Sequence, residues 1–239
     1  MVRLNVRFLP SLVSSKDVDG ATAVVIDVLR ASTTIVHALA AGAKSVKPCL
    51  TVEEAREFAE HEDDVILGGE RGGVKISGFN FGNSPLEYNS DAVKDRTVVF
   101  TTTNGTKALM HCQKASRILI GSFVNLSAVC ERLSTTDHIE LICAGTDNEI
   151  TLEDVLCAGA VAHKLVLAYA GVSVNDQAKI AIDLWQQDGS HEALANSLRR
   201  GLGGENLVKL ELDQDVDVAA RVDTFDHVPE YDFGTDRIV

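Results

Sequence analysis

Short β-rich runs alternate with helical patterns through the first 145 or so residues, and this alternation limits the chain to few folds. Four helical patterns lie among the runs, at Thr33–Ala43, Val52–His61, Thr106–Cys112 and Asn125–Leu133. Such alternation predicts a layered α/β/α fold with a parallel or mixed sheet. The expected strands are Arg3–Phe8, Ala23–Leu29, Ser45–Cys49, Val65–Gly68, Thr97–Thr101, Arg117–Gly121 and His138–Cys143.

From Thr151 onward the pattern becomes mostly helical, and the tail Val222–Val239 is typical of a closing strand or wrap. We expect residues 1–239 to form a single unit. If the unit divides into two lobes, residues 170–174 are the boundary that the sequence favours. The expected C-terminal helices are Leu152–Ala170, Val174–Gln186, His191–Leu198 and Glu205–Leu210.

Composition and net charge indicate a globular protein and argue against two kinds of partner, nucleic acid and membranes. The chain is 45% hydrophobic and 24% charged, as in ordinary globular proteins, and its formal net charge is −13. A field of this sign repels nucleic acid and anionic membranes, so we expect neither as a partner. No uncharged apolar stretch approaches the ~18–20 residues that span a bilayer, and the N-terminus lacks the apolar run of a signal peptide. We therefore expect a cytoplasmic protein, and the sequence leaves homo-oligomer formation open.

Three patterns that often mark chemistry are weak here. The five cysteines are scattered and never form a CxxC pair, and the seven histidines show no HxH or HExxH spacing, which argues against a zinc site. Asp17-Val18-Asp19-Gly20 imitates the DxDG motif of haloacid-dehalogenase-type phosphatases. The polar Ser14-Ser15-Lys16 precedes it instead of an apolar strand, so we expect it to lie in a loop.

The run Asp27-Val28-Leu29-Arg30-Ala31-Ser32-Thr33 follows an expected strand and opens an expected helix. Ligands of open α/β sheets bind outside the carboxyl ends of strands, where helix N-termini present unpaired N–H groups. Asp27 could bind a metal ion or attack phosphorus, and Arg30 has the planar fork that suits phosphate oxygens. The structural alternative is that Ser32 or Thr33 merely caps the helix while Asp27 bonds locally.

Two further loops are rich in glycine and polar side chains. In the first, glycines flank Glu70 and Arg71, and Asn80, Asn83 and Ser84 follow within a run of amide and hydroxyl groups. In the second, Thr103-Asn104-Gly105-Thr106 leads from an expected strand into an expected helix, with Lys107 next. Both loops suit an anionic ligand, although ordinary turns and strand threonines would give the same pattern.

A fourth segment pairs Cys143, at the end of an expected strand, with Glu153-Asp154 at the start of the long helix. Asp154 or Glu153 could be a second metal ligand, although carboxylates in a first helical turn are favoured by the helix dipole in any case. Cys143 could be a nucleophile only in a loop rich in N–H groups that ends in arginine. No such loop follows, and a buried thiol is the simpler interpretation.

Together and in this order, these segments resemble the 2-phosphosulfolactate phosphatase family across nearly the whole chain. The resemblance rests on Asp27–Thr34, Gly69-Glu70-Arg71, Gly78–Pro85, Thr101–Thr106, Cys143–Thr146 and Glu153-Asp154-Val155. Members of this family are α/β enzymes that require Mg²⁺ and release phosphate from 2-phospho-3-sulfolactate, in the route toward coenzyme M. One departure stands out, because Gly201-Leu202-Gly203-Gly204 occupies the place of a Ser-x-His-Gly-like stretch.

The resemblance implies a Mg²⁺-dependent phosphatase for a small anionic phosphoester, with Asp27, Glu70 and Asp154 as the acidic and metal-binding groups. Whether Asp27 binds the metal or forms an aspartyl-phosphate stays open. The altered stretch at 201–204 keeps a second hypothesis open, a catalytically silent protein that binds a small anion. The expected substrate-binding residues are Arg30, Ser32, Thr33, Arg71, Asn80, Asn83, Ser84, Thr103, Asn104, Gly105 and Thr106.

Overall fold

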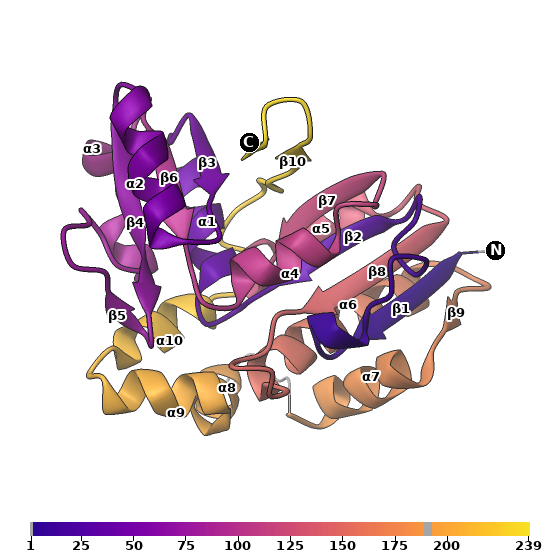
Figure 1. The fold of residues 1–239 in the computed structure, drawn as a ribbon. Coiled ribbons are helices and arrows are strands. Elements are labelled where there is room, and N and C mark those ends of the chain that lie inside the picture. The colour runs from indigo at the N-terminus through magenta and orange to yellow at the C-terminus, as the bar shows by residue number, and fades with distance from the viewer. Residues whose placement is uncertain (1, 189–192) are drawn as a thin grey trace.

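The structure is a computed structural model that describes residues 2–188 and 193–239. Within these residues the strands form two sheets (Figure 1). The first sheet is parallel throughout. Its strands, in spatial order, are β7 (Arg117–Gly121), β2 (Thr22–Ile26), β8 (His138–Cys143), β1 (Arg3–Arg7) and β9 (Ser173–Val174).

The second sheet is mixed. Strands β3, β6 and β4 are parallel to one another, and antiparallel strands extend both edges. Its strands, in spatial order, are β10 (Tyr231–Asp232), β11 (Arg237–Ile238), β3 (Ser45–Pro48), β6 (Thr97–Thr101), β4 (Val65–Arg71) and β5 (Val74–Lys75). The C-terminal tail therefore closes one edge of this sheet, as the sequence predicts.

The side chains of β2 alternate between two core clusters, which shows how the layers are built. Val24 and Ile26 pack with helices α5 (Leu126–Arg132) and α6 (Leu152–Ala168). Ala23 and Val25 pack in a second cluster with α1 (Ala31–Ala40) and α4 (Gly105–His111). The first sheet is thus covered on both faces, which explains why β2 is buried at every position.

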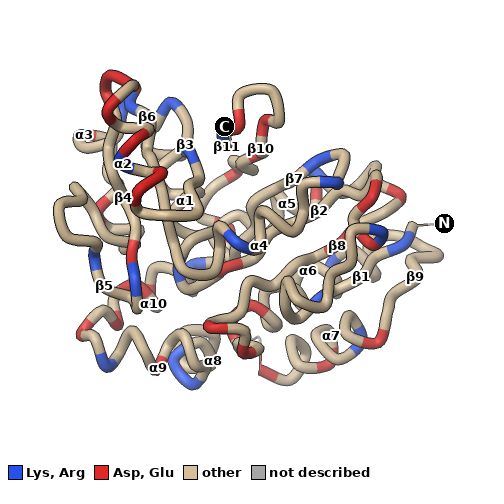
Figure 2. The backbone as a smooth tube through the Cα atoms, viewed as in Figure 1, with Lys and Arg blue, Asp and Glu red and all other residues tan. Residues whose placement is uncertain are grey.

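Helix α1 lies between the two sheets. Its Ile35 and Val36 share one buried cluster with Val98 of β6 and Ile120 of β7. Burial of each such aliphatic side chain stabilises the fold by about 1.5–3 kcal/mol. Helix α2 (Val52–His61) packs on β4 and β6 of the second sheet, and acidic residues are frequent along it (Figure 2).

The C-terminal helices fold back toward the junction of the two sheets (Figure 1). They are α8 (Leu194–Arg200), α9 (Leu202–Lys209) and α10 (Asp213–Ala219), whereas α7 (Asp176–Asp188) packs on α6 and on β1 of the first sheet. Residues 191–192 of the helix predicted at His191–Leu198 lie outside the described residues. Short elements complete the chain: η1 (Pro10–Leu12), η2 (Pro85–Glu87), α3 (Ser90–Val93) and η3 (Phe123–Asn125).

The layered α/β class and all seven predicted strands are confirmed, whereas the division into two sheets was not foreseen. The chain enters the second sheet after α1 and leaves it after β6, before the tail returns to it. Residues 173–174 form β9, which pairs with β1 in the first sheet. Of the helices described, none is both long and apolar enough to traverse a lipid bilayer.

Candidate active site

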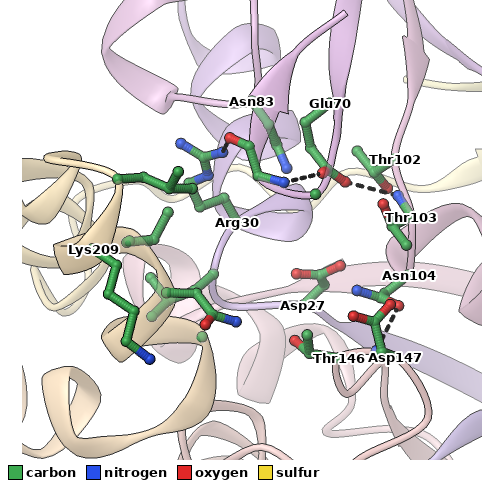
Figure 3. A pocket seen from close by; sticks show the side chains of 17 residues that line it. Asp27, Arg30, Glu70, Asn83, Thr102, Thr103, Asn104, Thr146, Asp147 and Lys209 are labelled. Carbon is green, nitrogen blue, oxygen red and sulfur yellow. Dashed lines mark hydrogen bonds between the residues drawn. The ribbon is translucent and has the colours of Figure 1, made fainter.

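A cavity of about 410 Å³ opens where carboxyl ends of strands from both sheets meet (Figure 3). Asp27 follows β2 and Thr146 follows β8 in the first sheet, while Glu70 is the second-last residue of β4 and Thr103 follows β6 in the second. Helix α9 forms the facing wall. The residues that line the cavity are Asp27, Leu29, Arg30, Glu70, Gly72, Gly73, Asn83, Thr102, Thr103, Asn104, Thr146, Asp147, Gly203, Asn206, Leu207, Lys209 and Leu210.

Asp27 lies in the tight turn between β2 and α1. Its Oδ1 accepts the Ala31 N–H (3.2 Å), and its own N–H donates to Ser32 Oγ (3.0 Å). Thr33 Oγ1 donates to the Val28 carbonyl (2.7 Å). Ser32 and Thr33 therefore secure the turn and do not line the cavity. In the described part of the chain, Asp27 Oδ2 accepts no hydrogen bond, which leaves it available to a ligand.

Burial, reinforced by the nearby carboxylate of Asp154, raises the pKa of Asp27 well above its usual value. Asp154 lies in the first turn of α6 behind the cavity. Its Oδ1 accepts the Val28 N–H (2.8 Å), and its Oδ2 accepts the Gly145 N–H (2.9 Å). Asp154 thus ties the loops after β2 and β8 together. Burial raises the pKa of Asp154 to about 6 despite these bonds.

Glu153, beside Asp154, is 1% exposed and faces the start of α9. Burial and the neighbouring Asp154 raise the pKa of Glu153 to about 8. Among the described residues, no group donates to its Oε2. A Cβ atom at Gly201 or Gly203 would lie 2.2 or 2.0 Å from the Glu153 carboxylate oxygens. Gly201 and Gly203 therefore make room for a buried carboxylate.

Glu70 joins two loops at the second sheet (Figure 3). Its Oε1 accepts the Thr103 N–H (2.8 Å), and its Oε2 accepts the Gly73 N–H (2.7 Å) in the β4–β5 hairpin. Arg71 has a different surrounding, because its guanidinium donates to Thr101 Oγ1 (2.9 Å) and to the Glu70 carbonyl (2.7 Å). Glu70 lines the cavity, whereas Arg71 braces the end of β4 outside it.

Arg30 is the buried cation of the cavity, with 4% of its surface exposed. Its Nη1 lies 2.6 Å from Asp215 Oδ2, and its Nη2 donates to the Gly73 carbonyl (2.8 Å). Asn83 is also buried in the cavity wall, and among the described residues its Oδ1 has no donor. Ser84 donates instead to Asp215 Oδ1 (2.6 Å).

The loop after β6 carries Thr103 and Asn104 into the cavity. Asn104 Oδ1 accepts the Asp147 N–H (3.2 Å), which links this loop to the one after β8. Gly105 can only be glycine here, because a Cβ atom would lie 2.7 Å from Ala31 Cβ and 2.8 Å from Asp27 Oδ2. Gly105 therefore lets α4 approach the Asp27 carboxylate.

The structure thus brings six of the predicted site residues to the cavity: Asp27, Arg30, Glu70, Asn83, Thr103 and Asn104. The others lie in the supporting turns and strands around it: Ser32, Thr33, Arg71, Asn80, Ser84, Gly105, Thr106 and Asp154. Asn80 is exposed and accepts the Leu67 N–H (2.9 Å). Thr106 is buried in the first turn of α4, where its hydroxyl faces Thr102.

Sequence reasoning missed Asp147, Asn206, Lys209 and Asp215. A signal for Asp215 did exist. In the pattern Asp215-Val216-x-Val218-Ala219, an acid shares the apolar face of a helix, and all four of these residues are buried. An acid on such a face is buried with a partner or with a ligand.

Two alternative motifs have structural explanations. Cys143 is fully buried in the core below the cavity, and burial raises the pKa of its thiol well above the usual value, unlike that of a reactive cysteine. Asp17 pairs with Arg7 (2.9 Å) and accepts the Ser14 N–H (2.8 Å). The Asp17-Val18-Asp19-Gly20 run lies in a loop, as expected.

The oxygens of the cavity fit a hard divalent cation that keeps part of its water shell. Asp27 and Glu70 present carboxylates, and the unpartnered Asn83 Oδ1 adds a neutral oxygen. Mg²⁺ is usually held by one or two carboxylates together with substrate phosphate and water. Over residues 2–188 and 193–239, no three His, Cys, Asp or Glu side chains are grouped to enclose a metal ion.

Comparison with known proteins agrees with this geometry. Residues 7–234 match the family model described as 2-phosphosulpholactate phosphatase. A probable 2-phosphosulfolactate phosphatase of Symbiobacterium thermophilum is 41% identical over 224 residues, which cover 92% of this chain and 95% of the relative. A protein of the same name from Carboxydothermus hydrogenoformans is 36% identical over 239 residues, which cover 100% and 97%. The chain belongs to the 2-phosphosulfolactate phosphatase family.

Proposed function

We propose that the protein is a Mg²⁺-dependent phosphatase that hydrolyses 2-phospho-3-sulfolactate, or a related 2-hydroxy-acid phosphomonoester, to the hydroxy acid and phosphate. Family membership supports the reaction. The observation that carries the metal requirement is the charge of the cavity. Asp27, Glu70 and Asp147 outnumber Arg30 and Lys209, so a multiply anionic ester needs a further positive charge to bind there.

In this proposal Asp27 and Glu70 hold the metal ion. When bound, Mg²⁺ neutralises charge on the phosphoryl oxygens and polarises the P–O bond. Arg30 donates guanidinium N–H groups to the same oxygens. Lys209 and Asn206, three residues apart on α9, contact another anionic group of the substrate, its carboxylate or its sulfonate. Phosphoryl transfer depends mainly on such positioning and charge neutralisation.

The reaction forms one P–O bond and breaks another. Oxygen attacks phosphorus, the ester P–O bond breaks, and the departing alkoxide takes up a proton. The attacking oxygen belongs either to water or to the Asp27 carboxylate, whose Oδ2 faces the cavity. The two routes differ in whether the phosphoryl group becomes bound to Asp27 before water releases it. Mass spectrometry of protein quenched in acid during turnover distinguishes them, because only the second route yields a chain that carries a phosphoryl group on Asp27.

The proposal is tested by measuring phosphate release from phospholactate-type esters with Mg²⁺ and with an excess of chelator. We expect release that depends on Mg²⁺. Ester binding without release would instead support the silent anion-binding protein. Release that persists in chelator would refute the metal requirement while leaving the phosphatase activity in place.

A further inference from the structure

Asp215 is a buried acid that lies far in sequence from its two side-chain partners, Arg30 and Ser84. It is 2% exposed on α10, and both of its carboxylate oxygens are engaged. Oδ2 lies 2.6 Å from Arg30 Nη1, and Oδ1 accepts the Ser84 hydroxyl (2.6 Å). Asp215 therefore connects the loop after β2, the loop before η2 and the C-terminal helices at a single point.

Arg30 is held from two sides. Asp215 binds Nη1, and the Gly73 carbonyl accepts from Nη2 (2.8 Å). A guanidinium carries five N–H donors in a fixed plane, so two anchored positions fix the direction of those that remain. Arg30 lines the cavity together with Asp27 and Glu70, so its remaining N–H donors are the ones available to a ligand there.

We propose that Asp215 is a positioning residue that fixes the guanidinium plane of Arg30 toward the phosphate group of the ligand. This inference rests on the proposed function, because it takes the cavity to be a phosphate site. Asp215 also cancels the formal charge of Arg30, so the arginine contributes oriented N–H donors more than net charge. An acid in this place opposes anion binding electrostatically, and its presence is explained by the orientation that it imposes.

The variants that isolate this role lie on one helix. Asp215→Asn keeps the shape of the side chain and one of its two acceptor oxygens. Asp215→Ala removes both oxygens. Asp217 is the matched control, because it lies on the same helix but is exposed at the surface, where it pairs with Arg199 (2.6 Å). The probe is inorganic phosphate in the presence of Mg²⁺, with its dissociation constant measured by calorimetry.

We expect Asp215→Ala to weaken phosphate binding and to lower kcat/KM by about 10²-fold, the loss typical of a misplaced catalytic contact. Asp215→Asn should lose less, and Asp217→Ala should stay within twofold of wild type. A double variant that combines Asp215→Ala with Arg30→Met distinguishes this role from a general loss of stability. If Asp215 acts through Arg30, the double variant loses no more than Arg30→Met alone.

Additive losses in the double variant, or equal phosphate affinity of wild type, Asp215→Asn and Asp215→Ala, would overturn the inference. A wild-type protein that binds no phosphate would also overturn it. Turnover tests the proposed function separately: phosphate that binds tightly without ester hydrolysis refutes the phosphatase, and the affinities of the variants still decide the role of Asp215.

Discussion

The Glu153 carboxylate occupies the space that a side chain at residue 203 would need, since a Cβ atom on Gly203 would lie 2.0 Å from Glu153 Oε1. Glu153 is buried at the start of α6, and Gly203 lies in the first turn of α9. The contact fixes where α9 begins and thereby places Asn206 and Lys209 in the cavity. The glycines at 201–204 are thus part of the site's support.

The first prediction concerns Gly203→Ala. Alanine is the better helix former by about 0.8–1 kcal/mol, so an unhindered site would gain stability. We expect instead a loss of about 1–3 kcal/mol in the free energy of unfolding, measured by urea denaturation, because the methyl group forces the buried Glu153 to move. The same substitution in a Glu153→Ala background should cost much less.

Gly204→Ala is the control for this contact. Its Cβ atom would lie 2.1 Å from the Leu198 carbonyl oxygen, a backbone atom of α8. Truncation of Glu153 should therefore leave the cost of Gly204→Ala unchanged. If Glu153→Ala relieves both glycine variants equally, the clash assigned to the carboxylate is not the cause.

The second prediction follows from the pKa of Glu153, which is about 8 in the folded protein against 4.5 for a glutamate side chain in water. Between these values the folded state binds more protons than the unfolded state, so stability falls as pH rises. One proton corresponds to a slope of up to about 1.4 kcal/mol per pH unit. Glu153→Gln should flatten the decline between pH 6.5 and 8, measured by urea denaturation. An unchanged slope would show that Glu153 does not carry this proton.

Much of the fold was readable from local patterns. The strand Thr97–Thr101 and the helix Val52–His61 match their predicted bounds, because apolar periodicity and the Thr51 cap act within a few residues. The division into two sheets depends on pairings such as Val46 with Val98, which join distant parts of the chain. No local pattern distinguishes these partners from those in the other sheet.

The part of the site that lies at the ends of strands was also predictable from the sequence. Asp27, Glu70 and Asn104 each follow or end a strand, and parallel strands bring such positions to one edge. Arg71 was expected to bind the ligand beside Glu70, but neighbouring residues of a strand point to opposite faces, and only Glu70 reaches the cavity. The contribution of α9 could not be read at all, because it depends on how the C-terminal helices fold back.

The third prediction concerns Asp27→Asn. The substitution removes a buried carboxylate that lies near Asp154 and Glu70, so it relieves like-charge repulsion in the metal-free protein. We expect no loss of Tm without metal, together with a loss of turnover of at least about 10³-fold. Wild-type Tm should rise with Mg²⁺ concentration, and Asp27→Asn should lose that response. Asp19→Asn is the control, since Asp19 is exposed in a loop, and it should keep both activity and the Mg²⁺ response.

The fourth prediction separates substrate binding from chemistry at Lys209. Its side chain is 68% exposed, and its Nζ lies 3.7 Å from Glu205 Oε2 on the same face of α9. An exposed charge of this kind contributes at most about 1 kcal/mol, so Lys209→Ala should raise KM about fivefold and leave kcat nearly unchanged. The salt dependence of KM should weaken in the same variant, because one screened attraction has been removed. Lys179→Ala, at a surface pair with Asp176 on α7, should change neither quantity. A fall in kcat with KM unchanged would instead place Lys209 at the reacting phosphorus, because only an interaction made in the transition state alters kcat alone.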